Sequence, residues 1–234
     1  MRSIVTILRL VGILGFILFS STAIAAAHHS GATLGSFDVD QSGAATYSIP
    51  LQVPPGIGGM QPSLSLNYSS QGGNGLLGVG WSLGGMSAIS RCPTNLTDDG
   101  FIDGVDFDSN DKFCLDGQRL QPISTTEYRT RIESFSKITR TGSNAQDPDG
   151  FVVKTKSGQT MYYGRVSGLV SEDARVEANG VNAGKALFWV IKKIADVSGN
   201  YILFNYTEDS LSGEHYISRI DYGSVSTGLF ASIQ

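Results

Sequence analysis

The sequence predicts an all-β fold of meandering antiparallel hairpins that forms part of a larger β-shell or barrel-like assembly. Three observations support this prediction. Short runs alternate apolar and polar residues with a period of two, which is typical of strands. Turn residues separate these runs, and the later runs are rich in aromatic and β-branched side chains. Because isolated hairpins are marginally stable, we expect each one to stack on the next.

The amino terminus has the pattern of a secretory signal peptide, predicted to cover residues 1–27. Arg2 and Arg9 flank the start of an apolar run from Leu10 to Phe19, and small residues at A-x-A spacing follow it. The alternative is an uncleaved membrane anchor, which needs about 18 or more apolar residues, so the run is too short. Residues 28–35 are predicted to be a flexible lead-in. The protein is therefore expected to be exported, to the periplasm or outside the cell.

Residues 36–234 are predicted to form one β module. Three strands are expected first, at residues 37–39, 45–53 and 64–68. Pro54-Pro55-Gly56 separates the last two, because proline cannot donate to a ladder and glycine supplies turn torsions. Trp81, in an almost uncharged stretch, is expected to be buried.

The later strands carry the strongest hairpin patterns. The expected strand segments are residues 113–120, 124–139 (where a helix is the alternative), 151–156, 159–164, 188–194, 201–207 and 216–223. The polar segment Ser167–Lys185 is expected to be a surface loop, with or without a short helix. Residues 228–234 show no closing segment, which predicts an exposed sheet edge. We therefore interpret the chain as the front part of a larger architecture or as truncated at its C-terminus.

The charge balance argues against a nucleic-acid partner. Without the leader the chain has 15 Lys and Arg against 21 Asp and Glu, a net charge of 15 − 21 = −6. A nucleic-acid partner would require a basic face to neutralise its phosphates. No stable membrane span is expected after leader cleavage.

Cys92 and Cys114 are the two cysteines of the chain. An even pair in an oxidising compartment predicts a disulfide, and the alternative is two buried free thiols. Closing a loop of this length stabilises a protein by roughly 3 kcal/mol in the chain-entropy model.

The glycine run matches the dinucleotide fingerprint by letter, at Gly73, Gly75 and Gly78. The fingerprint works only when a helix N-terminus follows directly and holds the pyrophosphate. The residues that follow are too rich in glycine for a helix. We therefore interpret the glycines as turn residues, and predict no cofactor-binding residue.

An acidic loop contains the weak metal candidates Asp106, Asp108 and Asn110, spaced like the first ligands of a calcium loop. The EF-hand pattern then fails, since Asp111 stands where glycine is needed and Gly117 where glutamate is needed. A hard-cation site of another geometry is one interpretation, and a solvated cluster of Asp and Asn turns is the preferred one.

No catalytic residue is predicted. The histidines are His28 and His29 in the lead-in and His215 in an expected hairpin loop, where a surface histidine is favoured over a general base. Tyr162, Tyr163 and Trp189 are candidate exposed aromatics for glycan binding, although such residues more often pack inside a sheet.

Two segments, GNGLLGVGWSL and DFDSNDKFCLDGQRL, together with ATYSIPLQVPPGIGGMQPSLSLNYSS before them, resemble the amino-terminal region of the virulence-plasmid B protein and the insecticidal toxin-complex B component. The same region opens many Rhs/YD-repeat proteins. The resemblance covers most of residues 35–223 and implies an all-β module at the front of a long polypeptide. In toxin-complex relatives it forms part of a hollow shell around a toxic segment. In the virulence-plasmid protein an ADP-ribosyltransferase occupies a separate domain.

The resemblance transfers no catalytic residue, and the toxin-complex relatives do not begin with a cleavable leader. It implies that the partners are the remaining Rhs or toxin polypeptide, or toxin-complex subunits. The predicted function is a non-enzymatic structural module of a secreted bacterial toxin or Rhs-like virulence protein. The alternative is a surface adhesion or glycan-binding module.

Overall fold

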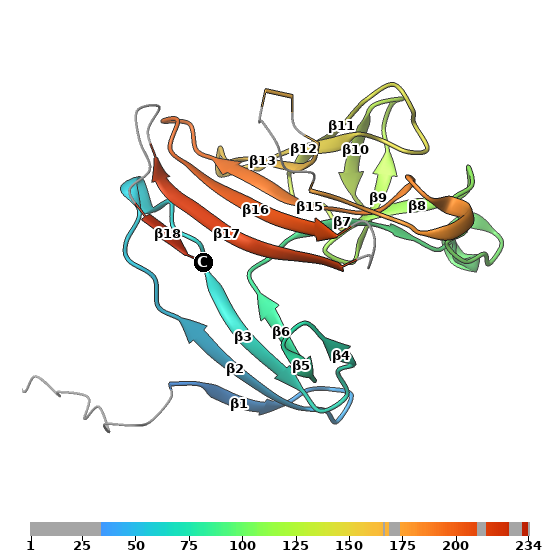
Figure 1. The fold of residues 1–234 in the computed structure, drawn as a ribbon. Helices are drawn as coiled ribbons and strands as arrows, with labels where there is room; N and C mark the ends of the chain where they lie inside the picture. Colours follow the sequence, from blue (N-terminus) through green and yellow to red (C-terminus); the bar gives the residue numbers. More distant parts are fainter. Residues whose placement is uncertain (1–33, 166, 169–173, 210–213, 225–230, 234) are drawn as a thin grey trace, which may run out of the picture. The chain divides into compact units, whose positions relative to one another are not determined.

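Antiparallel strands make up nearly all of the regular secondary structure in the computed structural model, which describes residues 34–165, 167–168, 174–209, 214–224 and 231–233 (Figure 1). Helix is confined there to α2 (Leu96–Asp99) and the 3-10 turns η1 (Ile57–Gly59) and η2 (Gly180–Asn182). Within these ranges no helix has the length and apolar character that crossing a bilayer requires. The all-β prediction is confirmed. The predicted signal peptide, with His28 and His29, lies outside the described residues.

The strands fall into three sheets within the compact unit Gly35–Gln234. The four-stranded sheet contains β1 (Ser36–Val39), β2 (Ala45–Leu51), β3 (Leu64–Ser69) and β6 (Trp81–Gly84). A two-stranded hairpin contains β4 (Asn74–Gly75) and β5 (Gly78–Val79). The twelve-stranded sheet contains β7 (Ala88–Cys92), β8 (Lys112–Leu115), β9 (Gln118–Pro122), β10 (Glu127–Thr130), β11 (Lys137–Thr141), β12 (Gly150–Lys154), β13 (Thr160–Gly164), β14 (Arg175–Glu177), β15 (Ala186–Ala195), β16 (Tyr201–Asp209), β17 (Glu214–Ser224) and β18 (Ala231–Ile233).

Eight strands of the large sheet close into a barrel. Strands β7 to β13 meander, each pairing with the next, and β15 pairs with both ends of that series. The first half of β15 pairs with β7 through Phe188–Val190, and the second half pairs with β13 through Ile191–Ala195. A register shift between Tyr162 and Tyr163 accompanies the change, as bulges do where strands bend. The barrel-like part of the prediction is confirmed.

Aromatic rings fill the barrel. Trp189 is fully buried, and its ring centroid lies 5.3 Å from that of Phe113 and 5.2 Å from that of Phe151, both in edge-to-face geometry. The indole Nε1 of Trp189 donates to the Pro148 carbonyl at 2.8 Å. Ring pairs of this geometry add to the free energy gained by burial. The same core continues through β15 to β16 and β17, where Phe204, Ile220 and Tyr222 are buried.

Three expectations about local structure are wrong. Ser167–Lys185 contains the short helical turn η2, as the alternative allowed, but it is not otherwise only a loop, because Arg175–Glu177 forms β14 along the edge of β15. Trp81 is half-buried rather than buried, because its strand belongs to the four-stranded sheet and not to the barrel. His215 lies in β17 and stacks on the Tyr206 ring, with centroids 4.9 Å apart, instead of lying in a hairpin loop.

Candidate functional site

A buried ion cluster centres on Arg91, whose side chain points into the barrel from β7. Its guanidinium donates to the Asp111 carboxylate at 3.2 Å, and both side chains are 1% exposed. It also donates to the backbone carbonyls of Ala186 at 2.7 Å and Gln146 at 2.6 Å. Each of the three guanidinium nitrogens therefore has a hydrogen-bond acceptor. These bonds offset the free energy lost when the charge is removed from water.

Aromatic rings surround the same guanidinium. Its central carbon lies 5.1 Å from the centroid of the Phe107 ring and 5.7 Å from that of Trp189. Such cation–π contacts strengthen when water is excluded. The barrel interior around Arg91 is thus filled by packed rings. The Asp111 carboxylate neutralises the charge of Arg91.

Asp147 connects this cluster to β14. One carboxylate oxygen lies 3.3 Å from Arg91, and the other accepts a hydrogen bond from Arg175. Arg175 also donates to Glu177 at 2.6 Å. This cluster was not predicted from the sequence, because its members are far apart in the chain. One signal in the sequence was Arg91 itself. It follows the apolar Ile89 by two residues, so the two side chains share one face of the strand, which indicates a charge that points toward the core.

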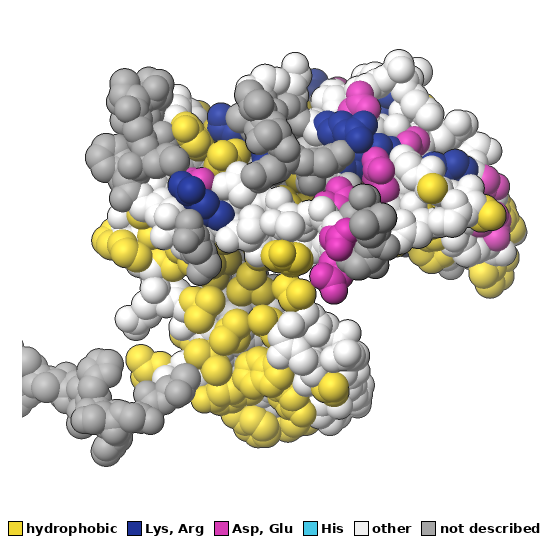
Figure 2. Space-filling model, in the orientation of Figure 1, with side chains coloured by type: hydrophobic (Ala, Val, Ile, Leu, Met, Phe, Trp, Pro, Cys, Tyr) yellow, Lys and Arg dark blue, Asp and Glu magenta, His cyan; other side chains and the backbone are white. Residues whose placement is uncertain are grey.

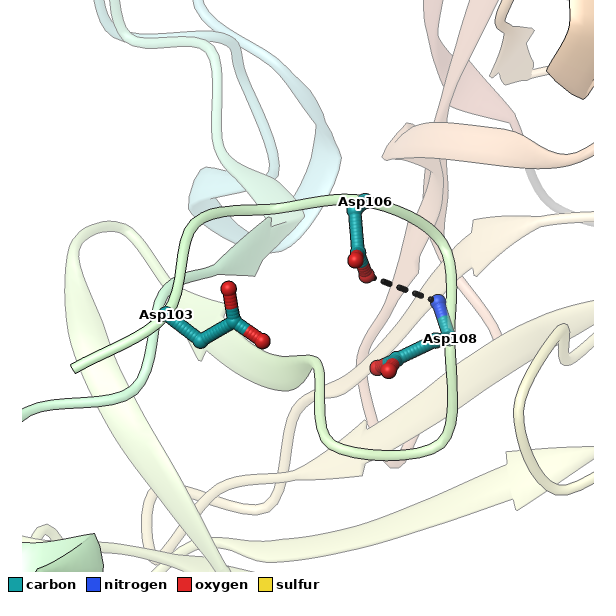
Figure 3. A group of neighbouring side chains, drawn as sticks. All are labelled: Asp103, Asp106 and Asp108. Atoms are coloured by element: carbon teal, nitrogen blue, oxygen red, sulfur yellow. Dashed lines mark hydrogen bonds between the residues drawn. The ribbon is translucent and has the colours of Figure 1, made fainter. Parts of the chain in front are cut away.

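The acidic loop brings Asp103, Asp106 and Asp108 together, with one oxygen of each within 4.8 Å of the others (Figure 3). The predicted candidates Asp106 and Asp108 are in this group, and Asp103 was not among the candidates. Asn110 lies beside it and donates through Nδ2 to Asp103 and to Asp108, each at 3.0 Å.

The carboxylates of this loop hold its turns. The backbone N–H of Asp108 donates to Asp106 at 3.3 Å, and that of Asn110 donates to Asp108 at 2.7 Å. Burial, followed by the neighbouring Asp108 charge, raises the pKa of Asp106. These bonds are those of Asp and Asn turns. The metal interpretation of Asp106, Asp108 and Asn110 stays a prediction, and none of the loop's hydrogen bonds requires a cation.

The structure joins Cys92 and Cys114, whose Cα atoms are 6.0 Å apart. They lie on the paired strands β7 and β8 as a diagonal pair, because Cys92 pairs with Lys112 and Cys114 lies two residues further along β8. This separation is typical of a disulfide. Formation of the bond in the exported protein stays a prediction, which a thiol titration tests.

The glycine run forms the hairpin β4–β5 and then β6, so no helix follows the fingerprint letters. Gly78 and Gly80 have φ angles of 103° and 79°, which only glycine adopts readily. A Cβ on Gly80 would lie 2.7 Å from both the Ser69 carbonyl oxygen and the Tyr68 ring. The glycines therefore serve turns and close packing, as we interpreted them.

The candidate glycan-binding aromatics are mostly inside the protein. Trp189 is 0% exposed and Tyr163 is 1% exposed, and Tyr162 alone is partly accessible. Burial raises the pKa of Tyr163, whose hydroxyl lies 2.8 Å from Ser87 Oγ. Tyr163 and Trp189 are thus wrong as exposed binding residues, because their strands β13 and β15 close the barrel.

An apolar groove of about 590 Å³ lies beside the barrel. Its lining comes from the four-stranded sheet, the β4–β5 hairpin and the strands β15–β18. Leu66, Trp81 and Leu83 form one wall, while Ile217 and Ile220 belong to the other. Sequence reasoning did not identify this groove, whose walls come from separate parts of the chain.

Comparison with known proteins gives a consistent result. Residues 39–221 match the family model described as Salmonella virulence plasmid 65kDa B protein. The chain is 24% identical over 217 aligned positions to the mono(ADP-ribosyl)transferase SpvB of Salmonella typhimurium strain 14028s. That alignment covers 79% of this chain and 35% of the relative, so the chain spans about a third of the length of the curated relatives it matches.

Two solved structures share the fold. The amino-terminal domain of the effector protein SpvB from Salmonella typhimurium strain LT2 aligns with a TM-score of 0.58 and 21% identity, over 78% of this chain and 66% of that one. TcdB2-TccC3 without its hypervariable C-terminal region aligns with a TM-score of 0.65 and 20% identity, over 84% of this chain and 10% of that one. Since the family model covers well over half of the sequence, the chain belongs to the Salmonella virulence plasmid 65kDa B protein family.

Proposed function

We propose that this chain is a non-enzymatic structural module of a secreted bacterial toxin or Rhs-like virulence protein, which helps to build a shell that carries a toxic domain. The observation that carries the proposal is the filled barrel. Its interior holds packed rings and the Arg91–Asp111 pair, and the side chains singled out for chemistry hold turns or pack in the core.

The shared fold supports the structural part of the proposal. A toxin-complex chain and the amino-terminal domain of an effector protein both contain this arrangement of strands. In each comparison the similarity covers a portion of a longer polypeptide. A module of that kind contributes a rigid wall, while the chemistry resides elsewhere.

The proposed partners are the remaining Rhs or toxin polypeptide, or other toxin-complex subunits. We propose export by the predicted leader, to the periplasm or beyond. The net charge of the chain without that leader, −6, is consistent with a protein partner and unfavourable for a nucleic acid.

The test of the shell is co-expression with the polypeptide encoded immediately downstream, whether fused to residue 234 or separate. We expect the two to co-purify, and limited proteolysis to spare a segment that is cut when this module is absent. A downstream polypeptide that neither contains β repeats nor co-purifies would contradict the proposed assembly.

The non-enzymatic part has its own test. Purified protein is incubated with labelled NAD and a cell lysate, beside an active ADP-ribosyltransferase as control. We expect no label on any protein. Labelling that depends on this chain would overturn the proposal irrespective of the co-purification result.

A further inference from the structure

The four-stranded sheet places its large apolar side chains on one face and most of its polar side chains on the other. Its register aligns an aromatic row across all four strands, followed by two aliphatic rows. The aromatic row is Phe37, Tyr47, Tyr68 and Trp81, and the aliphatic rows are Ile49, Leu66 and Leu83, then Leu51 and Leu64. Directly paired residues lie on the same face of a sheet, so these side chains form one surface, which we name the apolar face.

The other face is polar. The alternate positions are occupied by Ser36, Asp38, Thr46, Ser48, Ser65, Asn67, Ser69 and Ser82, together with Pro50 and Gly84. Ser48 and Ser65 both donate to the Asn67 side-chain oxygen, at 2.8 Å and 3.0 Å. One face therefore suits water, and the opposite face suits a packed interior.

Within the described part of the chain the apolar face is covered only in part. Leu51, Leu64, Leu66, Trp81 and Leu83 line the groove opposite β17, whereas the rest of the aromatic row and Ile49 lie outside that groove. Phe37 is 68% exposed and Val39, beside it on β1, is 55% exposed. Of the rows, only Leu64 belongs to the buried core, and Leu51 packs against it. Figure 2 shows hydrophobic side chains gathered over β2, β3 and β6. An exposed apolar surface of this extent marks an interaction site.

The surface is also uncharged. No Asp, Glu, Lys, Arg or His occurs between Gln41 and Ser90. In a two-fold symmetric contact the same patch of two copies lies face to face. A charge in the patch would therefore lie near the same charge of the other copy. A patch without charge avoids this repulsion. Membrane surfaces, in contrast, are usually bound by apolar faces bordered with Lys and Arg, which this segment lacks.

We propose that the apolar face binds a second copy of this chain, stacking two four-stranded sheets into a β-sandwich. A two-fold axis parallel to the rows lays the aromatic row of each copy over the aliphatic rows of the other, so that large side chains meet smaller ones. Sheets stacked in this way pack about 10 Å apart. The proposal is independent of the toxin-shell function.

The size of the surface sets the strength of the contact. Strands of 4, 7, 6 and 4 residues, spaced about 4.8 Å apart with a rise of about 3.3 Å per residue, cover roughly 330 Å². The exposed Leu76, Leu77 and Val79 of the β4–β5 hairpin extend this area. Stable complexes bury about 800 Å² per partner. We therefore expect a reversible dimer that dissociates in the micromolar range.

The test is sedimentation equilibrium of the purified protein from about 1 to 100 μM, a range that brackets the expected micromolar dissociation. Leu83→Lys and Ser82→Lys add the same charge to neighbouring residues of β6, on opposite faces. Leu83→Lys is expected to raise the dissociation constant at least tenfold, and Ser82→Lys to change it less than twofold. Val39→Lys, at a side chain already exposed, tests the same face if Leu83→Lys fails to fold, with Ser36→Lys as its control.

Several outcomes overturn the proposal. A wild-type protein that is monomeric throughout the range does so, as does equal dissociation by Leu83→Lys and Ser82→Lys. The wild-type protein is also mixed with vesicles of neutral phosphatidylcholine. A monomer that co-sediments with these vesicles, and loses binding in Val39→Lys, would assign the apolar face to lipid instead.

Discussion

The barrel and the four-stranded sheet use the same alternation of apolar and polar residues, with opposite outcomes. In the barrel, closure by β15 turns the apolar side chains inward, and Ile89, Ile138 and Trp189 are 0% exposed. In the four-stranded sheet the aromatic row ends at Phe37, which is 68% exposed. Alternation thus defines the two faces of a sheet, while burial depends on what packs against the apolar one.

The two regions also differ in their content of charged residues. The barrel contains a buried arginine matched by Asp111 and Asp147, whereas the strands β2, β3 and β6 contain no charged residue. Ions within the barrel specify one arrangement of its loops, because a misplaced partner leaves a buried charge unpaired. The open sheet has no such constraint and remains available to a partner.

Removing an aromatic ring from each region gives the largest expected contrast. Trp189→Ala should lower the free energy of unfolding by about 4 kcal/mol, because it leaves a cavity among Phe113 and Phe151. Trp81→Ala, at a half-buried side chain, should cost about 1 kcal/mol in dilute protein. Urea unfolding followed by circular dichroism measures both. Equal losses would mean that the four-stranded sheet is packed as firmly as the barrel.

Removing the buried cation is the next largest change. Arg91→Met keeps much of the apolar stem and leaves Asp111 without its cation, so we expect a loss of about 3 kcal/mol or slightly more. The matched control is Arg131→Met, since Arg131 pairs with Asp98 at 2.7 Å but is 51% exposed, and an exposed pair contributes about 0–1 kcal/mol. A stable Arg91→Met protein would show that packing alone maintains the barrel.

The predicted disulfide places a constraint in the barrel, whereas the four-stranded sheet contains no cysteine. Replacing both Cys92 and Cys114 by serine should cost about 3 kcal/mol, chiefly by freeing the unfolded chain. The exported wild-type protein, unfolded without reductant, should show no free thiol in an Ellman titration and two after reduction. Two thiols before reduction would contradict the bond.

Lowering the pH is expected to give the smallest effect on stability. The two regions respond alike, because each contains a turn held by the carboxylate of an aspartate. Asp40 accepts from Ser42 Oγ at 2.6 Å in the β1–β2 turn, and Asp196 accepts from Asn200 Nδ2 at 2.8 Å in the β15–β16 turn. These side-chain hydrogen bonds, first among several, lower the pKa of both carboxyls below 3.8.

The lowered pKa values determine the direction in which stability changes with pH. A carboxyl with a lowered folded-state pKa stabilises the protein above its unfolded pKa, and that stabilisation is lost as the pH falls through the folded value. Both turns should therefore weaken only below about pH 4. An NMR titration of the carboxyl carbons measures both pKa values, and Asp106, whose pKa is raised by burial, is the control that should move the other way.

Much of the strand pattern could be predicted from the sequence. The pairs β12–β13, β15–β16 and β16–β17 occupy the segments where alternation and turn residues indicated hairpins. The predictions failed where residues distant in sequence meet. Arg91, Asp147 and Arg175 form one cluster, and nothing local to any of them indicates the other two.

The local pattern of residues sets which side chains share each side of a strand, because successive side chains of extended backbone point in opposite directions. It also sets the turns, through glycine and through Asp hydrogen bonds that act over a few residues. Which apolar faces are enclosed depends instead on contacts between distant strands. Closure requires β15 to pair with both β7 and β13, and this long-range pairing buries Trp189 while leaving part of the apolar face of the four-stranded sheet exposed.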